Sequence, residues 1–288
     1  MFALMSEPSL SSFIARNRSV LIDVTETRGS TPREAGTYML VADEEIWGTI
    51  GGGQFEYMAI DNARAILKGG GEAIMDIPLG PEIGQCCGGR TKLRFTVVTP
   101  SIAGALQHRL LRERDERPAV FLFGAGHVGL ALATALLPLP FAVTIVETRR
   151  QALQDLPSDV TPRLTAMPEA SVDEIPPGGA AVILTHDHAL DFLIAERALA
   201  RRDLNYVGMI GSATKRATFS HWLDRQQGEE TGKQETAAMM SRLVLPIGGS
   251  AIRDKRPEVI AALVAAELLQ HLPLTAPATL SERQIATD

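Results

Sequence analysis

Short apolar runs alternate with longer stretches of helical spacing through the C-terminal half of the chain. The runs carry no charged side chain, which is typical of parallel strands that are covered on both faces of a sheet. The alternation of such strands with helices predicts a doubly wound parallel sheet. The expected strands are residues 119–123, 141–146, 180–185, 206–209 and 243–245.

The N-terminal half has a different pattern, in which short strand-like segments are separated by glycine-rich breaks. Residues 54–67 have helical spacing between the glycine runs at 51–53 and 69–71, and glycines there are expected to bound a helix. This half is therefore predicted to be a smaller mixed α/β domain. Its expected strands are residues 19–25, 37–42, 45–50, 73–78 and 92–98.

The length of 288 residues agrees with two domains, since a domain usually has roughly 100–200 residues. Residues 226–238 are polar and are expected to form a mobile loop, and Pro257 is expected to start a last helix that reaches residue 269. The predicted divisions are an N-terminal domain over 1–100, a linking helix over 101–117, a second domain over 118–273 and a tail over 274–288.

Composition narrows the classes of function. The net charge of −6 argues against a general affinity for nucleic acid, because such binding needs a basic face. The two cysteines, Cys86 and Cys87, are adjacent, so a disulfide between them could not cross-link distant segments as the disulfides of small secreted domains do. The first ten residues lack the pattern of a signal peptide. Residues 119–146 are uncharged but read as strand, glycine turn, helix and strand, so no membrane span is expected. We therefore expect a cytoplasmic protein.

Residues 124–129 read Gly-Ala-Gly-His-Val-Gly between an expected strand and an expected helix, and Glu147 ends the next strand. This pattern predicts a Rossmann-like phosphate site. Gly124 permits the tight turn, Gly126 lets the backbone approach a phosphate, and Gly129 lets helix and strand pack closely. The helix N-terminus at His127 attracts the anion, and Glu147 is placed to accept a ribose hydroxyl. The alternative is a glycine turn that serves packing alone.

Polar residues and glycines also follow the other expected strands. His186, Asp187 and His188 follow one strand, and Gly211 and Ser212 follow the next. Because the carboxyl ends of parallel strands share one edge, these residues are expected to join the ligand site. The histidines supply only two nitrogens, whereas zinc usually takes three or four protein ligands. The alternative to a metal site is a helix capped by Asp187, with both histidines lining the ligand crevice.

Cys86 and Cys87 lie between Gly84 and the pair Gly88 and Gly89. The glycines favour an exposed, closely approached backbone, and thiolates there are suited to binding a soft metal or handling sulfur. The alternative is a pair of small hydrophobic residues in a loop.

Six motifs occur in order along the chain, namely GSTPREAG (29–36), GTIGGGQFE (48–56), GQCCGGR (84–90), FGAGHVG (123–129), LTHDHALD (184–191) and YVGMIGSATKR (206–216). Taken together, these motifs resemble the XdhC/CoxI family of accessory proteins for xanthine dehydrogenase, over about residues 20–269. The resemblance implies a molybdenum cofactor chaperone, not an enzyme, that holds molybdopterin during sulfuration and inserts it into xanthine dehydrogenase. It also implies a cysteine desulfurase as sulfur donor and an oligomeric state.

Carried over position by position, the family motifs match Cys86, Cys87, Gly124, Gly126, Gly129, His186 and Asp187. The resemblance makes the two cysteines candidate ligands of the cofactor's molybdenum. One departure concerns Gln54, where related sequences often have a cysteine after the triple glycine. If that cysteine binds cofactor in relatives, its role here passes to the cysteine pair or is absent.

Two other functions stay open at this point. An NAD(P)-dependent oxidoreductase is favoured by Glu147, since molybdopterin has no ribose to occupy that acid. The N-terminal half argues against an oxidoreductase, because no candidate proton donor and no group that would hold a substrate stand out there. The second alternative is a regulatory nucleotide sensor that performs no chemistry.

Overall fold

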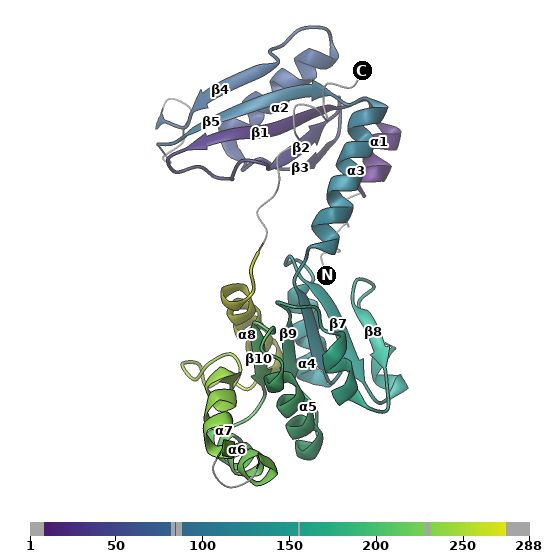
Figure 1. Cartoon of the computed structure of the whole chain (residues 1–288). Helices are drawn as coiled ribbons and strands as arrows, with labels where there is room; N and C mark the ends of the chain where they lie inside the picture. Colours follow the sequence, from purple (N-terminus) through teal and green to yellow (C-terminus); the bar gives the residue numbers. More distant parts are fainter. Residues whose placement is uncertain (1–8, 82–83, 85–87, 155, 228–230, 275–288) are drawn as a thin grey trace. The chain divides into compact units, whose positions relative to one another are not determined.

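The computed structural model describes residues 9–274, apart from 82–83, 85–87, 155 and 228–230. The chain forms two compact units, of which the first ends at Asp115 and the second begins at Glu116 (Figure 1). Cys86, Cys87 and nearly all of the predicted tail over 274–288 lie outside the described residues. No helix in the described part of the chain is both long and apolar enough to cross a membrane.

The first unit is built on an antiparallel sheet with the strand order β3-β2-β1-β5-β4. Its long central strand β1 pairs with β2 on one side and with β5 on the other. The elements are α1 (Leu10–Arg16), β1 (Val20–Arg28), β2 (Tyr38–Val41), β3 (Ile46–Gly48), α2 (Gly53–Leu67), β4 (Ile74–Pro78), β5 (Arg90–Val97) and α3 (Pro100–Asp115).

Alternation along β1 decides which helix covers each face of this sheet. Val20, Ile22 and Val24 join the core under α2, whereas Leu21 joins a second cluster with Leu106 of α3. Successive side chains of a strand point to opposite faces, so β1 contributes apolar side chains to the cores on both faces of the sheet. Helix α3, where the sequence predicted a linker, therefore packs within the first unit.

The second unit contains a parallel sheet with the strand order β11-β10-β9-β6-β7-β8. Every neighbouring pair in it is parallel, which confirms the predicted doubly wound α/β fold. The elements are β6 (Ala119–Phe123), α4 (His127–Leu136), β7 (Ala142–Glu147), η2 (Arg150–Leu153), β8 (Thr161–Leu164), η3 (Pro168–Glu174), β9 (Ala180–Ile183), α5 (His188–Ala200), β10 (Tyr206–Met209), α6 (Ala213–Gln227), α7 (Thr231–Arg242), β11 (Leu243–Val244) and α8 (Pro257–His271).

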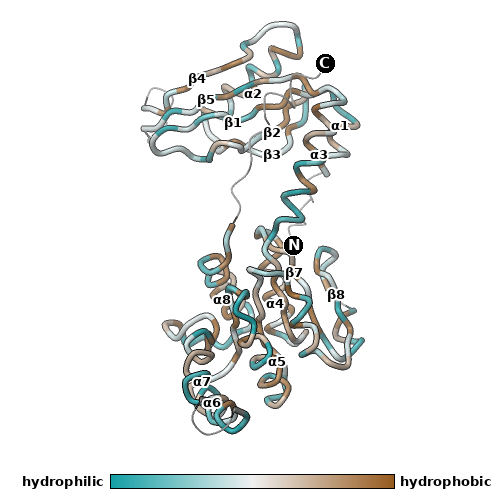
Figure 2. The backbone as a smooth tube through the Cα atoms, viewed as in Figure 1, coloured by the Kyte–Doolittle hydropathy of each residue, from teal (hydrophilic) through white to brown (hydrophobic). Residues whose placement is uncertain are grey.

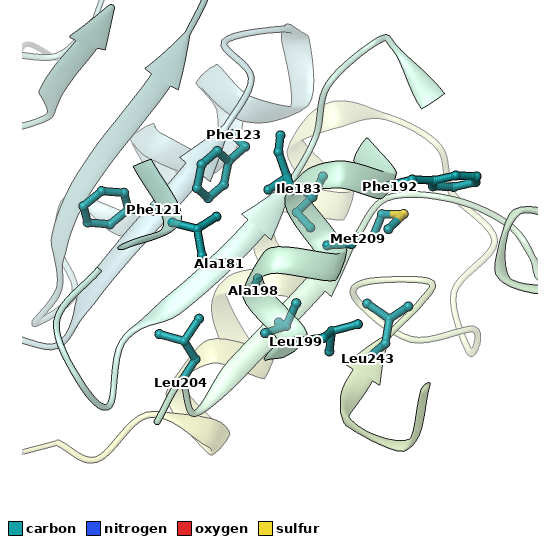
Figure 3. Packing of buried hydrophobic residues seen from close by; sticks show 14 of the residues in the cluster. Phe121, Phe123, Ala181, Ile183, Phe192, Ala198, Leu199, Leu204, Met209 and Leu243 are labelled. Carbon is teal, nitrogen blue, oxygen red and sulfur yellow. The ribbon is translucent and has the colours of Figure 1, made fainter. Parts of the chain in front are cut away.

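Helices cover both faces of the parallel sheet. One face packs against α4 and α8. The other packs against α5, α6 and α7, and Figure 3 shows Phe121, Phe123 and Ile183 of the sheet beside Ala198 and Leu199 of α5. This two-sided cover explains why the apolar runs carry no charged side chain. The sheet therefore fixes the strand ends, and the loops that follow them, on a rigid frame.

The structure corrects the expectation of a loop over 226–238. Helix α6 continues to Gln227 and α7 begins at Thr231. Thr236 and Met239 of α7 are buried, and the helix begins with a polar stretch, while α6 beside it is coloured mainly teal, that is hydrophilic, in Figure 2. Helix α7 packs on α6 and α5. Its sequence has too few apolar positions to show the periodic pattern from which an amphipathic helix is predicted.

Candidate functional site

The glycine turn between β6 and α4 has the backbone that its sequence pattern predicts. Gly124 has a φ of +119°, and a Cβ there would lie 2.8 Å from the Leu184 carbonyl oxygen. A Cβ on Gly129 would lie 2.1 Å from the Gly124 carbonyl oxygen. Side chains at these two positions would therefore collide with backbone, so both glycines are required by the close packing of strand and helix.

Gly126 is constrained by a side chain rather than by backbone. It is the N-cap of α4, and a Cβ on it would lie 2.8 Å from His186 Nε2. The loop after β9 thus closes over the first turn of α4. The free N–H groups of a helix N-terminus, together with the positive end of its dipole, favour an anion at this place.

Glu147 occupies the position from which an acid usually reaches a ribose, but its carboxylate is already engaged. Its Oε2 accepts from Ala125 N at 3.0 Å and from the Arg149 guanidinium at 2.9 Å. Its Oε1 accepts from Thr148 N at 2.8 Å, from Arg149 N at 3.0 Å and from Arg149 Nε at 3.1 Å. The carboxylate therefore ties the glycine turn to the end of β7, and a ribose hydroxyl would have to displace one of these donors.

The electrostatics of Glu147 agree with this structural role. Burial raises the pKa of the carboxyl, but hydrogen bonds from Arg149, Ala125 and Thr148 outweigh it and lower the pKa from 4.5 to about 2. The side chain is only 5% exposed. Glu147 is thus a permanently ionised, satisfied anchor at neutral pH.

The loop after β9 starts helix α5, as one reading of the sequence expected. Asp187 is the N-cap, and its Oδ1 accepts from Ala189 N at 2.8 Å. His186 and His188 flank it and are exposed. Among the described residues, no group of three His, Cys, Asp or Glu side chains is placed to hold a metal ion. The arrangement leaves the two histidines at the edge of the sheet as ring donors beside a helix start.

A buried ion pair beneath this loop was not predicted from the sequence. Lys215 Nζ donates to Asp191 Oδ2 and, at 2.9 Å, to the Ile210 carbonyl oxygen. Asp191 Oδ1 accepts from Thr185 Oγ1 at 2.6 Å. Lys215 is 9% exposed and Asp191 is 1% exposed. The pair therefore joins α5 and α6 to the ends of β9 and β10. The acidic residue in the first turn of α5 was a signal that the sequence offered.

Two hollows lie at this edge of the sheet, on either side of His186. The first, which we call the β7 pocket, has a volume of 230 Å³ and is lined by Gly124, Val146, Glu147, Thr148, Arg149, Pro168, Thr185, His186, Asp187 and Leu190. The second, which we call the α6 pocket, has a volume of 570 Å³ and is lined by Gly126, His127, Val128, Leu184, Thr185, His186, His188, Ile210, Gly211, Ser212, Lys215 and Lys255. Thr185 and His186 belong to both.

The α6 pocket gathers basic groups. Three imidazoles and two ammonium groups line it, and none of its described lining residues is acidic. Ser212 begins α6, where its Oγ accepts from Lys215 N at 3.3 Å, so a second helix N-terminus opens here. The Lys215 ammonium is paired with Asp191, so the Lys255 ammonium and the two helix N-termini are the groups that favour an anionic ligand here.

The N-terminal motifs lie in the first unit. The triple glycine precedes α2, and Glu56 Oε2 accepts from Ile50 N at 2.9 Å and Gly52 N at 3.0 Å. This turn is therefore satisfied by its own helix, and Gln54 is exposed at its start. Gly88, which follows the two cysteines in the sequence, forms a bridge with Ser30 of the GSTPREAG motif. The cysteines themselves lie outside the described residues.

Comparisons with known proteins agree with the motifs. Residues 120–268 match the XdhC Rossmann domain, and residues 14–78 match the XdhC and CoxI family. The chain is 28% identical to "Uncharacterized protein YqeB" of Escherichia coli (strain K12) over 87% of its length. It is 30% identical, over 54% of its length, to a protein of Bacillus subtilis (strain 168) that is named a probable xanthine dehydrogenase subunit. The alignments cover 43% of each of these relatives.

The fold is also similar to the crystal structure of a xanthine dehydrogenase from Bacillus halodurans. The TM-score is 0.71 at 17% sequence identity, over 88% of this chain and 91% of that chain. At this identity the likeness concerns the fold alone. The match to the XdhC Rossmann domain covers more than half of the 288 residues, and the chain therefore belongs to the XdhC and CoxI family.

Proposed function

We propose that this protein is a molybdenum cofactor chaperone. It holds molybdopterin in the second unit while the cofactor gains a terminal sulfur, and it then inserts the cofactor into xanthine dehydrogenase. The observation that carries this proposal is the basic, acid-free α6 pocket beside the glycine turn, in a chain whose family is associated with xanthine dehydrogenase maturation.

The chemistry of the pocket suits molybdopterin, which has a terminal phosphate and a pterin ring. Backbone N–H groups after Gly126, the Ser212 hydroxyl and the Lys255 ammonium are donors for the phosphate. The volume of 570 Å³ falls within the range of small-molecule sites, which is about 300–1,000 Å³. When bound, the group supplies a molybdenum–dithiolene centre that takes up sulfur. The protein's part is to bind it, orient it and exclude water.

Several further assignments belong to the same proposal. Gly124, Gly126, His127, Gly129, His186, Asp187, Gly211 and Ser212 form the cofactor site, with Glu147 as the anchor of its turn. Cys86 and Cys87 supply thiolates toward molybdenum, because soft sulfur ligands suit such a centre. The partners are xanthine dehydrogenase and a cysteine desulfurase, and the protein acts as a homo-oligomer in the cytoplasm.

An NAD(P)-dependent oxidoreductase is the second candidate. The strand order and the glycine turn of the second unit favour it, since this topology often holds a dinucleotide. The state of Glu147 weighs against it, because donors already occupy both carboxylate oxygens. A nucleotide sensor without chemistry would face the same obstacle.

A transfer assay tests the proposal. The protein is loaded with molybdopterin and mixed with cysteine desulfurase and cofactor-free xanthine dehydrogenase, and xanthine oxidation is measured. We expect activation by the wild type and little activation by Gly126→Val, because the new side chain meets the His186 ring at the start of α4. Gly104→Val is the matched control, since nothing lies within 4 Å of a Cβ there. Equal activation by Gly126→Val would remove the turn from the site.

A further inference from the structure

We infer that the cleft holds its ligand in one direction, with the heteroaromatic ring in the β7 pocket and the phosphate in the α6 pocket. This inference rests on the proposed function and assigns the two ends of the ligand to different residues. The two pockets share Thr185 and His186 but differ in size and in charge.

The β7 pocket suits a flat ring. Its walls include the aliphatic side chains of Val146, Pro168 and Leu190, which can cover the faces of a ring. The charge of Arg149 is neutralised by the two-pronged contact with Glu147. Asp187 caps α5 through Oδ1, and no hydrogen bond within the described residues uses its Oδ2. A carboxylate oxygen there is an acceptor for the amino group of a pterin ring.

The α6 pocket suits the anionic end. Lys215 lies in its wall, with its ammonium group held by Asp191 and the Ile210 carbonyl oxygen. Lys255 and His188 line the rest and are exposed to the ligand space. A phosphate placed here meets the Lys255 ammonium and two helix N-termini, whereas in the β7 pocket it would meet the Asp187 carboxylate. This difference between the pockets favours the inferred direction of the ligand.

His186 stands between the two pockets. Its ring faces Gly126 closely, since a Cβ on that glycine would lie 2.8 Å from Nε2. Thr185 and His186 line both pockets, so a ligand with its ring in one pocket and its phosphate in the other would contact His186 between its two ends. His186 is therefore the positioning residue of the inferred arrangement.

Two probes separate the subsites in the purified full chain. Neopterin, a pterin without phosphate, reports on the ring through its fluorescence, and inorganic phosphate reports on the anion through calorimetry. We expect Leu190→Trp, which fills the β7 pocket, to weaken neopterin at least tenfold and to leave phosphate unchanged. We expect Lys255→Glu to weaken phosphate at least tenfold and to leave neopterin unchanged. Lys233→Glu, on the exposed side of α7, is the matched charge-reversal control and should change neither.

Three outcomes would overturn the inference: loss of neopterin with Lys255→Glu, loss of phosphate with Leu190→Trp, or equal loss of both probes in both variants. The proposed function is tested separately by retention of molybdopterin. If the wild type retains molybdopterin but the variants do not separate the probes, the orientation is wrong and the function stands. If the wild type retains no molybdopterin, the proposed function fails.

Discussion

Glu147→Gln tests the view that this acid anchors the glycine turn. The structure gives Glu147 a pKa of about 2, against an ordinary value of 4.5. At about 1.4 kcal/mol per unit, this lowering corresponds to roughly 3 kcal/mol of stability in the ionised state. Glutamine keeps the shape but cannot ionise, and its amide nitrogen would face the N–H donors of Ala125 or Thr148. We therefore expect a loss of about 3 kcal/mol at pH 7.

The pH dependence follows from the direction of the shift. Because the folded pKa lies below the unfolded one, the stabilisation is fully present above pH 4.5 and disappears as the pH falls through about 2. The difference between wild type and Glu147→Gln should therefore shrink to roughly 1 kcal/mol by pH 3. Glu235→Gln, at an exposed position of α7, is the matched control.

Urea unfolding measures the difference in the second unit. The chain has two tryptophans, and a Trp47→Phe background leaves Trp222 of α6 as the reporter. Unfolding free energies are compared between pH 3 and pH 7. A difference that is below about 1 kcal/mol at pH 7, or that stays constant across this range, would refute the role of Glu147 as an ionised anchor.

Three other changes test the remaining features. Gly129→Ala should destabilise the second unit by about 1–3 kcal/mol in urea, because its Cβ would lie 2.1 Å from a backbone carbonyl oxygen; unchanged stability would show that the turn is not tightly packed. Lys215→Met should cost about 3–5 kcal/mol by leaving Asp191 buried and unpaired, and adding Asp191→Leu should recover most of it; equal losses in the single and double variants would contradict the ion pair. Cys86→Ala with Cys87→Ala should lower xanthine dehydrogenase activation without unfolding the protein, and full activation would exclude the thiolates.

The pattern of apolar runs predicted the frame of the site well. Strands β6 and β10 begin and end where the sequence places them, because a strand buried on both faces leaves an uninterrupted apolar signal. Strand β8 was missed because all four of its residues are exposed and one of them is Pro162. Helix α1 was also missed, since seven residues at a chain end give little periodicity.

The candidate site was predicted less completely. The sequence identified the glycine turn and offered the Asp187 cap as one of two readings, and both are local patterns. It could not foresee the buried Lys215–Asp191 pair, whose members lie 24 residues apart and meet only in the folded sheet. It also assigned Glu147 to a ribose, because spacing alone does not show that Arg149 and three backbone N–H groups already bind the acid.

The most direct test of the central claim is an equilibrium binding measurement on the purified chain with molybdopterin, NADH and NADPH. We predict that molybdopterin is retained, that Gly126→Val abolishes its retention, and that neither nicotinamide cofactor displaces it. Tight binding and turnover of NADH or NADPH, with no retention of molybdopterin, would contradict the proposed function.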